Sequence, residues 1–258
     1  MPEFELALKE EEQSAPIPLG AVDGQTGYPP TISDLKGWIS LKRAGDMGDS
    51  TARNNPNRVR YLRRLGIRAD RHVYSCRQVH SREVVIVGDQ NPESVAVMEA
   101  DGLITSHPEA VLTVTVADCL PIYLVDREHG IFALLHSGWR GTGIVIEALE
   151  RMRRTYGSQP SRIAASIGPG IGACCYRVEE DRYLEFRRRF GERSVRRKNG
   201  LFYLDLPAAN IESLRSWGVK DISVCSDCSA CTHQLASFRR EGPGFSHMLA
   251  CVGVMGND

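Results

Sequence analysis

The chain has 258 residues, and its 32 Lys plus Arg balance its 32 Asp plus Glu, so the formal net charge at pH 7 is zero. This length suits one large domain or two small ones and is sufficient to bury a hydrophobic core. The neutral balance argues against a dedicated nucleic-acid-binding protein. No segment reaches the ~18 uninterrupted apolar residues of a membrane-spanning helix. Acids occupy the N-terminal positions where a signal peptide carries basic residues, so we expect a cytoplasmic protein with reduced cysteines.

The first third of the chain gives weak signals. Residues 1–35 have little periodicity and several glycines and prolines, which predicts an irregular or extended N-terminal lead-in. An apolar cluster around Trp38 predicts a first strand. Pro56 then suits the first turn of a helix in which apolar residues recur at helical spacing as far as Leu65.

Strands dominate the middle of the chain. They are predicted at 73–76, 83–87, 102–105, 112–117, 122–125 and 131–136. The remainder is predicted as helix 142–156, strand 163–167, a charged helix through DRYLEFRRRF, strand 202–204, helix 208–217 and strands 222–224 and 247–254. We expect Leu184 and Phe190 to anchor the charged helix in the core, and the basic run RRRFGERSVRRKNG to be a solvated helix end. This interleaving is not a regular βαβ alternation, so it favours a mixed α/β layered fold, with residues 36–258 as a single domain.

Three short segments each place a metal-capable side chain at the edge of an apolar run: RQVHS with His80, VADCLP with Cys119 and LLHSGWRG with His136. Loops at strand ends are where rigid scaffolds place reactive groups. Two His and one Cys are a partial zinc ligand set, and three protein ligands leave the open fourth position of a catalytic site. Taken singly, each residue has a simpler explanation, as a core histidine bonded to a carbonyl or a small buried thiol. Their wide separation in sequence does not decide between these readings.

Polar neighbours extend this candidate site. Asp118 could orient a ligand histidine, act as a general base or cap a turn. Arg140 lies near a predicted helix start, where its guanidinium and the helix amides could bind phosphate, or it is a surface residue. Gly138 and Gly141 allow the backbone to pass close to a ligand. The glycine-rich IGPGIGACCY lacks the Lys-Ser/Thr ending of a phosphate-binding loop, so it indicates a tight turn beside the site, with phosphate binding as the alternative.

A cysteine-rich segment, CSDCSACTH, holds Cys225, Cys228, Cys231 and His233. The C-x-x-C-x-x-C spacing is compatible with an iron–sulfur cluster or a second zinc ion, with His233 or a distant Cys as fourth ligand. Free thiols in a loop at a strand end are the alternative.

Six segments together carry a specific resemblance: RQVHS, ADGLIT, ADCLPIYLVD, HSGWRGT, IGPGIGACCY and SFRREG. In this order they resemble the laccase-domain family, over roughly residues 36 to 254. Members of that family have been labelled polyphenol oxidases, peptidoglycan editing factors and purine nucleoside phosphorylases with adenosine deaminase activity. The resemblance implies one α/β domain with helical layers outside mixed sheets, an α/β/β/α arrangement.

The resemblance also implies a site. It places one zinc ion on His80, Cys119 and His136, and it implies phosphorolysis of adenosine, inosine and methylthioadenosine together with deamination of adenosine. Asn57 and Arg58 resemble the family's NR pair. We therefore expect Arg58, Gln78 and Arg140 to bind substrate, with Asp118 as the acid/base. The expected partners are a nucleoside and phosphate, with no nucleic acid and no membrane, in a monomer or small homo-oligomer.

Some features depart from the family pattern, and other functions remain open. Ser137 replaces the commoner Ala of HxGWRG, and SFRREG stands where SYRRDG is usual. The cysteine-rich segment resembles the family's CTYC stretch but lacks its aromatic residue, which affects the base preference if the aromatic stacks on the purine. A copper-dependent phenol oxidase would use the same ligands, although a multicopper site needs more His than this triad offers. A cysteine hydrolase would use Cys119 as nucleophile and His136 as base. A binding role in cell-wall quality control is the non-enzymatic alternative.

Overall fold

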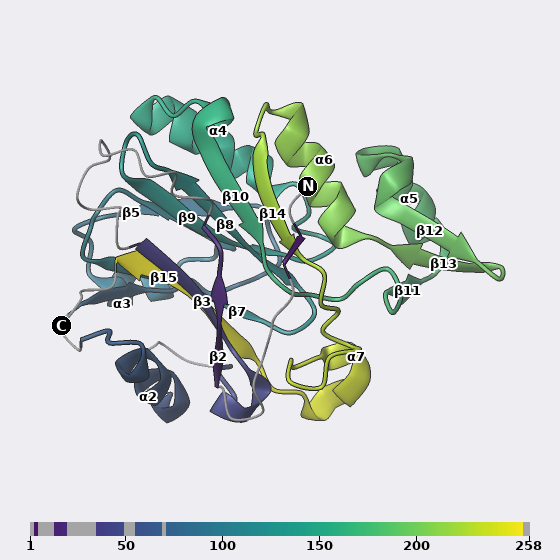
Figure 1. Cartoon of the computed structure of the whole chain (residues 1–258), viewed down its shortest axis with the longest axis horizontal. Helices are drawn as coiled ribbons and strands as arrows, with labels where there is room; N and C mark the ends of the chain where they lie inside the picture. Colours follow the sequence, from purple (N-terminus) through teal and green to yellow (C-terminus); the bar gives the residue numbers. More distant parts are fainter. Residues whose placement is uncertain (1–2, 5–12, 20–34, 49–54, 69–70, 255–258) are drawn as a thin grey trace.

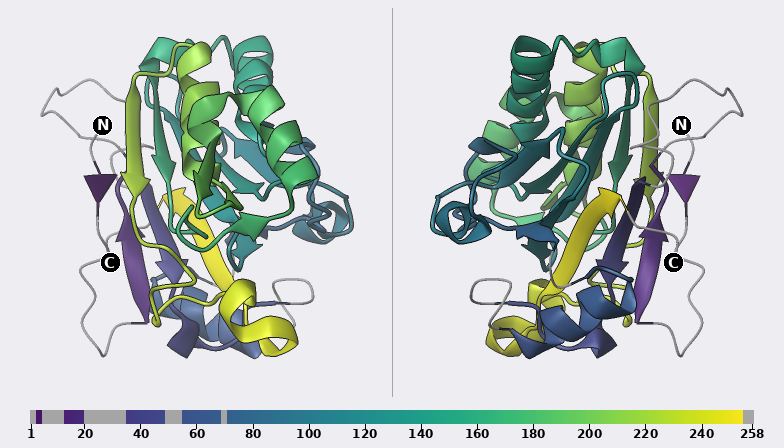
Figure 2. Two further views of the ribbon diagram at one scale, coloured as in Figure 1. Left: turned by 90° about the vertical axis from the view of Figure 1, so that its right-hand side faces the viewer. Right: turned by 90° about the vertical axis from the view of Figure 1, so that its left-hand side faces the viewer.

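The computed structural model describes residues 3–4, 13–19, 35–48, 55–68 and 71–254. Within them, two β-sheets stack face to face, and helices cover the outer face of each sheet (Figure 1 and Figure 2). The predicted mixed α/β fold with α/β/β/α layering is confirmed.

The larger sheet is mixed and contains seven of the described strands. These are β1 Glu3–Phe4, β5 Val84–Val87, β6 Gly102–Thr105, β8 Leu120–Asp126, β9 Ile131–Ser137, β10 Ile163–Ile167 and β14 Asp221–Cys225. Their order is β1-β14-β10-β8-β9-β6-β5. The central pairs β10/β8, β8/β9 and β9/β6 are antiparallel, whereas β1/β14, β14/β10 and β6/β5 are parallel.

The second sheet has five described strands in the order β2-β3-β15-β7-β4. They are β2 Ser14–Ile17, β3 Leu35–Ser40, β15 Met248–Val254, β7 Ala110–Val116 and β4 His72–Tyr74. All neighbours are antiparallel except β4 and β7. A separate antiparallel sheet is formed by β11 Arg177–Val178, β13 Leu201–Leu204 and β12 Val195–Lys198.

The helices lie outside the two sheets and in the connections. The α-helices are α2 Pro56–Arg64, α3 Pro92–Ala96, α4 Ile144–Tyr156, α5 Glu180–Phe190, α6 Leu206–Ser216 and α7 Phe238–Glu241. Short 3₁₀ helices are η1 Lys42–Ala44, η2 Pro160–Arg162, η3 Glu192–Ser194 and η4 Gly242–Gly244. None of the described helices is long and apolar enough to span a membrane.

Alternation along the strands creates two apolar layers. In β8, Leu120, Ile122 and Leu124 belong to the core beneath α4 and α6, whereas Tyr123 and Val125 face the five-stranded sheet. Because both faces of this sheet are covered, all seven residues of β8 are buried. The outer face of the five-stranded sheet packs against α2. The sheet carrying the candidate site is therefore held rigidly from both sides.

Most sequence predictions of strands and helices from residue 73 onward agree with the structure to within two residues. The helix predicted from Thr142 instead begins at Ile144, because Gly143 is its N-cap with φ of 94°, a left-handed conformation outside the helical range. Where the structure describes the lead-in 1–35, it is largely extended and partly paired as strands, so of the two predicted alternatives the irregular one does not hold there. Ser14–Ile17 pairs with β3 in the five-stranded sheet, and Glu3–Phe4 pairs with β14.

The expected core anchor Leu184 is wrong, because its side chain is 48% exposed. The buried residue of α5 is Phe186, and Phe190 packs partly against the same core. At about 100° per residue, Leu184 and Phe186 point about 160° apart around the helix, so when Phe186 faces the core Leu184 faces solvent. Phe190 lies only about 40° from Phe186 and therefore shares its side of the helix.

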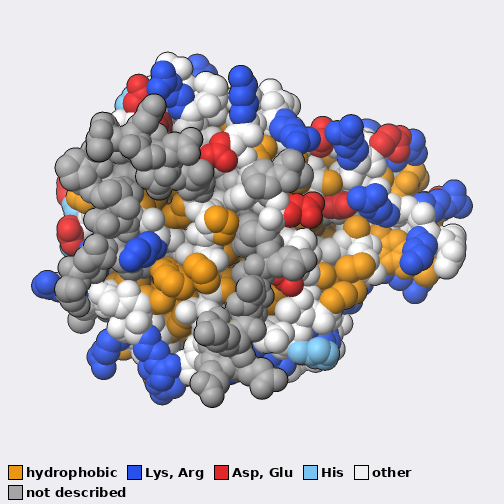
Figure 3. Space-filling view, viewed as in Figure 1, with side chains coloured by type: hydrophobic (Ala, Val, Ile, Leu, Met, Phe, Trp, Pro, Cys, Tyr) orange, Lys and Arg blue, Asp and Glu red, His pale blue; other side chains and the backbone are white. Residues whose placement is uncertain are grey.

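Four arginines of the basic run at the end of α5 form ion pairs with acids. Arg187 pairs with Glu192, Arg189 with Glu185, Arg193 with Glu212 and Arg196 with Asp205. On the face shown in Figure 3, Lys and Arg side chains are scattered around the rim, several of them beside Asp or Glu. These ion pairs support the reading of the run as a solvated surface.

Candidate metal centre and active site

The pairing register of three neighbouring strands brings the predicted ligands together. Leu120 of β8 pairs with Ser137 of β9, which places Cys119 beside Gly138 at the end of the sheet. Gly102 of β6 pairs with Leu135, and the backbone N–H of His136 donates to Asp101 O at 2.7 Å. Residues distant in sequence therefore meet where β8 and β6 begin and β9 ends.

The carboxylate of Asp101 holds two of the predicted ligand segments in place by hydrogen bonds. Its Oδ1 lies 2.8 Å from His136 Nδ1 and accepts the backbone N–H of His80 at 3.0 Å. Its Oδ2 accepts the Ser81 N–H at 2.6 Å and the Ser81 hydroxyl at 2.8 Å. One buried carboxylate thus fixes both His136 and the segment that carries His80. His80 itself has a φ of 60°, in the left-handed region.

His80, Cys119 and His136 form a compact group, with one nitrogen or sulfur atom from each within 4.8 Å of the others. The two imidazole rings are 4.9 Å apart at an interplanar angle of 76°. Because Nδ1 of His136 faces Asp101, its Nε2 is left for a metal ion. Gly138 is required for this approach, because a Cβ there would lie 2.7 Å from Cys119 Sγ and 3.3 Å from the His80 ring.

The thiol and the imidazole shift each other's protonation. Burial alone raises the pKa of Cys119, but the facing His136 and His80 side chains more than offset it and lower that pKa from 9.0 to about 6. Burial alone lowers the pKa of His136, whereas Cys119 and Asp101 raise it from 6.5 to about 9. The site therefore favours a thiolate next to a positive charge, which is the environment that a bound cation also provides.

The donor set fits zinc. Zinc in proteins takes His nitrogen at about 2.0–2.1 Å and Cys sulfur at about 2.3 Å, so tetrahedral ligand atoms lie roughly 3.3–3.6 Å apart. The spread of the three ligand atoms, within 4.8 Å, requires only small side-chain adjustments to reach this geometry. Three ligands leave one position for water or substrate, and the Asp101–His136 pair is the carboxylate–histidine arrangement that orients metal ligands.

Asp118 lies beside this group but uses its carboxylate elsewhere. Oδ1 accepts the Ser229 hydroxyl at 2.6 Å, and Oδ2 accepts the backbone N–H of Arg239 at 2.7 Å. Its carbonyl accepts the N–H of Ile171 at 2.8 Å, and its φ is 76°. Asp118 therefore connects the loops after β10 and β14 to the corner that carries Cys119.

Gln78 and Arg58, expected to bind substrate, are tied to the protein. The Gln78 amide donates to Thr115 O and accepts the N–H and hydroxyl of Thr115, which aligns its segment along β7. Arg58 is buried in α2, and its Nε donates to Met47 O at 2.7 Å. Both contacts position backbone segments.

Arg140 follows β9 in the turn before α4 and is exposed. Its guanidinium carbon lies 5.4 Å from the Trp139 ring centroid, and that of Arg182 in α5 lies 4.4 Å from the same ring. Two positively charged groups therefore gather on one aromatic residue two positions beyond the buried Ser137.

Two site features were not predicted from the sequence. The first is the role of Asp101, although ADGLIT places this acid directly before a buried strand. The second is the contact of Arg182 with Trp139, because nothing in the sequence of the charged helix indicates which of its arginines lies against that ring.

These features define a class: a layered α/β protein with an open His/Cys metal-ligand group at the end of one sheet. The chain belongs to the family described as multi-copper polyphenol oxidoreductase laccase, whose model matches residues 34–255. The resemblance drawn from the six segments is thereby confirmed.

Several relatives within the family carry enzyme names. A purine nucleoside phosphorylase of Deinococcus radiodurans is 34% identical over 199 residues, covering 77% of this chain and 76% of the relative. Purine nucleoside phosphorylase YlmD of Geobacillus stearothermophilus is 33% identical over 255 residues, covering 93% of this chain and 92% of the relative. An adenosine deaminase from an unknown prokaryotic organism is 30% identical over 237 residues, covering 86% of each. The solved structure of YlmD aligns with a TM-score of 0.78 and 26% identity, covering 92% of this chain and 99% of that one.

Proposed function

We propose that this chain is a zinc-dependent enzyme acting on purine nucleosides, by phosphorolysis of adenosine, inosine and methylthioadenosine and by deamination of adenosine. The observation that carries the proposal is the open three-ligand group of His80, Cys119 and His136 at the end of the large sheet. The names of the relatives, which include phosphorylases and a deaminase, support the substrate class.

His80, Cys119 and His136 would hold the ion, which when bound supplies a Lewis acid able to activate water or polarise the substrate. Asp101 keeps the Nδ1 proton of His136 and so directs Nε2 toward the site. Asp118 was expected to transfer protons, but its hydrogen bonds to Ser229 and Arg239 favour a positioning role.

Phosphorolysis requires a phosphate oxygen to attack C1′ of the ribose while the C1′–N9 bond breaks and the purine leaves. We assign phosphate binding to Arg140 together with Arg182, because both guanidinium groups gather at Trp139 next to β9. We assign purine stacking to Phe238, whose side chain is 52% exposed and whose neighbour Arg239 is hydrogen-bonded to Asp118.

The test is a nucleoside assay with purified protein. Wild type incubated with adenosine should release adenine only when phosphate is present, and should form inosine by deamination, with products separated by chromatography. His80→Ala should lose both activities. His107→Ala is the matched control, because His107 lies beyond the opposite end of β6 from Asp101. Absence of phosphate-dependent base release, or undiminished release by His80→Ala, would refute the proposal.

Copper is the alternative that the family description raises. His and Cys also bind copper, but this group supplies two His and one Cys, enough for one ion. Metal analysis of natively purified protein separates the two cases. Stoichiometric copper accompanied by oxygen-dependent phenol oxidation would favour the oxidase.

A further inference from the structure

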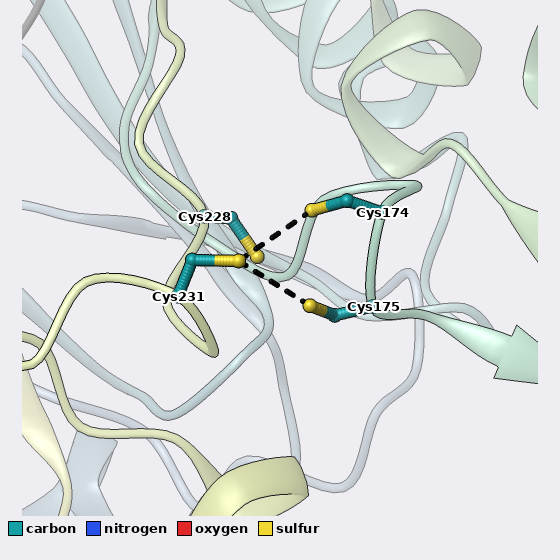
Figure 4. A group of neighbouring side chains, drawn as sticks. All are labelled: Cys174, Cys175, Cys228 and Cys231. Carbon is teal, nitrogen blue, oxygen red and sulfur yellow. Dashed lines mark hydrogen bonds between the residues drawn. The ribbon is translucent and has the colours of Figure 1, made fainter.

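Four cysteines outside this site meet at a single point. Cys174 and Cys175 lie in the loop after β10, and Cys228 and Cys231 lie in the loop after β14. Figure 4 shows the four sulfur atoms pointing toward a common centre between the two loops. No residue of the His80 group is shared with this cluster.

The sheet explains why these loops meet. β10 and β14 are neighbouring parallel strands, with Ile167 paired to Val224, so the loops leaving them start side by side. Gly170 forms a bridge with Cys228, and the Ser229 N–H donates to Gly170 O at 2.9 Å. The backbone is therefore fixed in the arrangement that gathers the thiols.

The sulfur spacing matches a single tetrahedral ion. Cys231 Sγ lies 3.8 Å from Cys174 Sγ and 3.4 Å from Cys175 Sγ, and all four sulfurs are within 4.8 Å of one another. Four sulfurs each about 2.3 Å from one zinc ion would be about 3.8 Å apart. An iron–sulfur cluster would have to place several iron and sulfide atoms between the thiols, and this spacing leaves room for one ion.

A backbone hydrogen bond favours the thiolate form of Cys228. The Gly172 N–H donates to Cys228 Sγ at 3.2 Å, the kind of outer interaction that stabilises a metal-bound thiolate. A Cβ at Gly172 would lie 3.2 Å from Cys174 Sγ and 3.3 Å from Cys228 Cβ, so glycine permits the tight turn. Cys174 and Cys231 are exposed, which gives an ion a path from solvent.

We propose that Cys174, Cys175, Cys228 and Cys231 bind one zinc ion as a closed, structural tetrathiolate site. The ligand set differs from the C-x-x-C-x-x-C pattern read from the sequence. Cys225 is buried at the end of β14 and its thiol faces Asp227 at 3.3 Å, and His233 lines a surface cavity with Lys42, Arg43 and Gln234. Two of the four ligands, Cys174 and Cys175, come instead from the distant glycine-rich segment.

This ion would clamp the two loops that hold the Cys119 corner. The Ile171 N–H, from the β10 loop, and the Ser229 hydroxyl, from the β14 loop, both donate to Asp118. Binding one ion to cysteines of both loops fixes these donors relative to each other. The tetrathiolate site thus helps to position Asp118 and makes no contact with the substrate.

The first test counts metal in full-length protein purified without chelators. Wild type should contain two zinc ions per chain, and His80→Ala and Cys231→Ser should each contain one. Cys225→Ala, the matched control from the same segment, should keep two. Wild type with one zinc that His80→Ala loses would overturn the proposal. So would iron or copper at the four cysteines, or a Cys175–Cys231 disulfide found by mass spectrometry of unreduced peptides.

A second measurement covers the case in which Cys231→Ser does not fold. His80→Ala protein, which keeps all four thiols of the cluster, is titrated with an organomercurial while a chromogenic chelator reports released zinc. Release of one zinc per chain is expected, and release of none contradicts the proposal. Both readouts count metal, so loss of nucleoside turnover would overturn the proposed function and leave this site standing.

Discussion

Asp101 is the residue on which the candidate metal centre depends most, although it supplies no ligand. Its carboxylate holds His136 Nδ1 and three groups of the 80–81 segment. We expect Asp101→Asn to weaken zinc affinity by about 10- to 100-fold, because the amide cannot replace the charge that orients His136. Competition with a fluorescent zinc chelator measures this change.

The chain offers a matched control for that substitution. Asp126 is also fully buried and lies 2.9 Å from a histidine, His129 Nδ1, at the far end of β8. Asp126→Asn removes a buried carboxylate–histidine pair without touching the ligands, so its zinc affinity should equal that of wild type. Equal weakening in both variants would mean that general destabilisation, and not ligand orientation, causes the loss.

Gly138 shows how tightly the ligands are set. Because a Cβ would stand 2.7 Å from Cys119 Sγ, Gly138→Ala should displace the sulfur or the β9 turn and reduce bound zinc to well below one equivalent at this centre. Gly244→Ala is the control, since a Cβ there meets nothing within 4 Å. Both glycine variants are made in the Cys231→Ser background, where the cysteine cluster binds no zinc, so that metal analysis counts only the ion at the His80 group. Full zinc occupancy in Gly138→Ala would contradict the geometry.

At the scale of elements, α5 separates what the sequence indicates from what packing decides. The charged helix was predicted correctly, but its buried residue is Phe186 and not Leu184. Phe186→Ala should lower the free energy of unfolding by about 3–5 kcal/mol, because it empties a filled core position. Leu184→Ala should have a much smaller effect, about 0.5 kcal/mol, because about half of that side chain is exposed and it fills no core position. Chemical denaturation of both variants checks the assignment, and a larger effect of Leu184→Ala would reverse it.

Elements with strong local signals were predictable, and their partners were not. The buried strands from residue 102 to 136 are continuous apolar runs whose bounds follow from composition. Ser14–Ile17 is short and contains Pro16, so only its pairing with β3 makes it a strand. His80, Cys119 and His136 were named from the sequence, yet what unites them is a strand register that only the fold specifies. For the same reason, the sequence did not predict that Cys174 and Cys175 lie beside Cys228, because the pairing of β10 with β14 brings them together.

At the scale of the whole molecule, the metal sites and the fold should be energetically linked. The His80 group joins the connection between β4 and β5 to the start of β8 and the end of β9, and the cysteine cluster joins the loops after β10 and β14. Each ion would therefore bind the folded chain and not the separated segments. An ion present at about 100 times its dissociation constant stabilises the folded state by about 2.7 kcal/mol. For a chain of this size, that corresponds to a rise in melting temperature of roughly 5–10 °C per site.

Calorimetry of metal-stripped protein, with and without added zinc, tests this linkage. Wild type should show the increments of both sites, and His80→Ala and Cys231→Ser should each show one. The double variant His80→Ala/Cys231→Ser should melt at the same temperature with and without zinc, because its two substitutions together remove both sites. A zinc-dependent rise that persists in the double variant would place the stabilising ion elsewhere in the chain. A rise absent from wild type would show that neither group binds zinc tightly enough to contribute to folding.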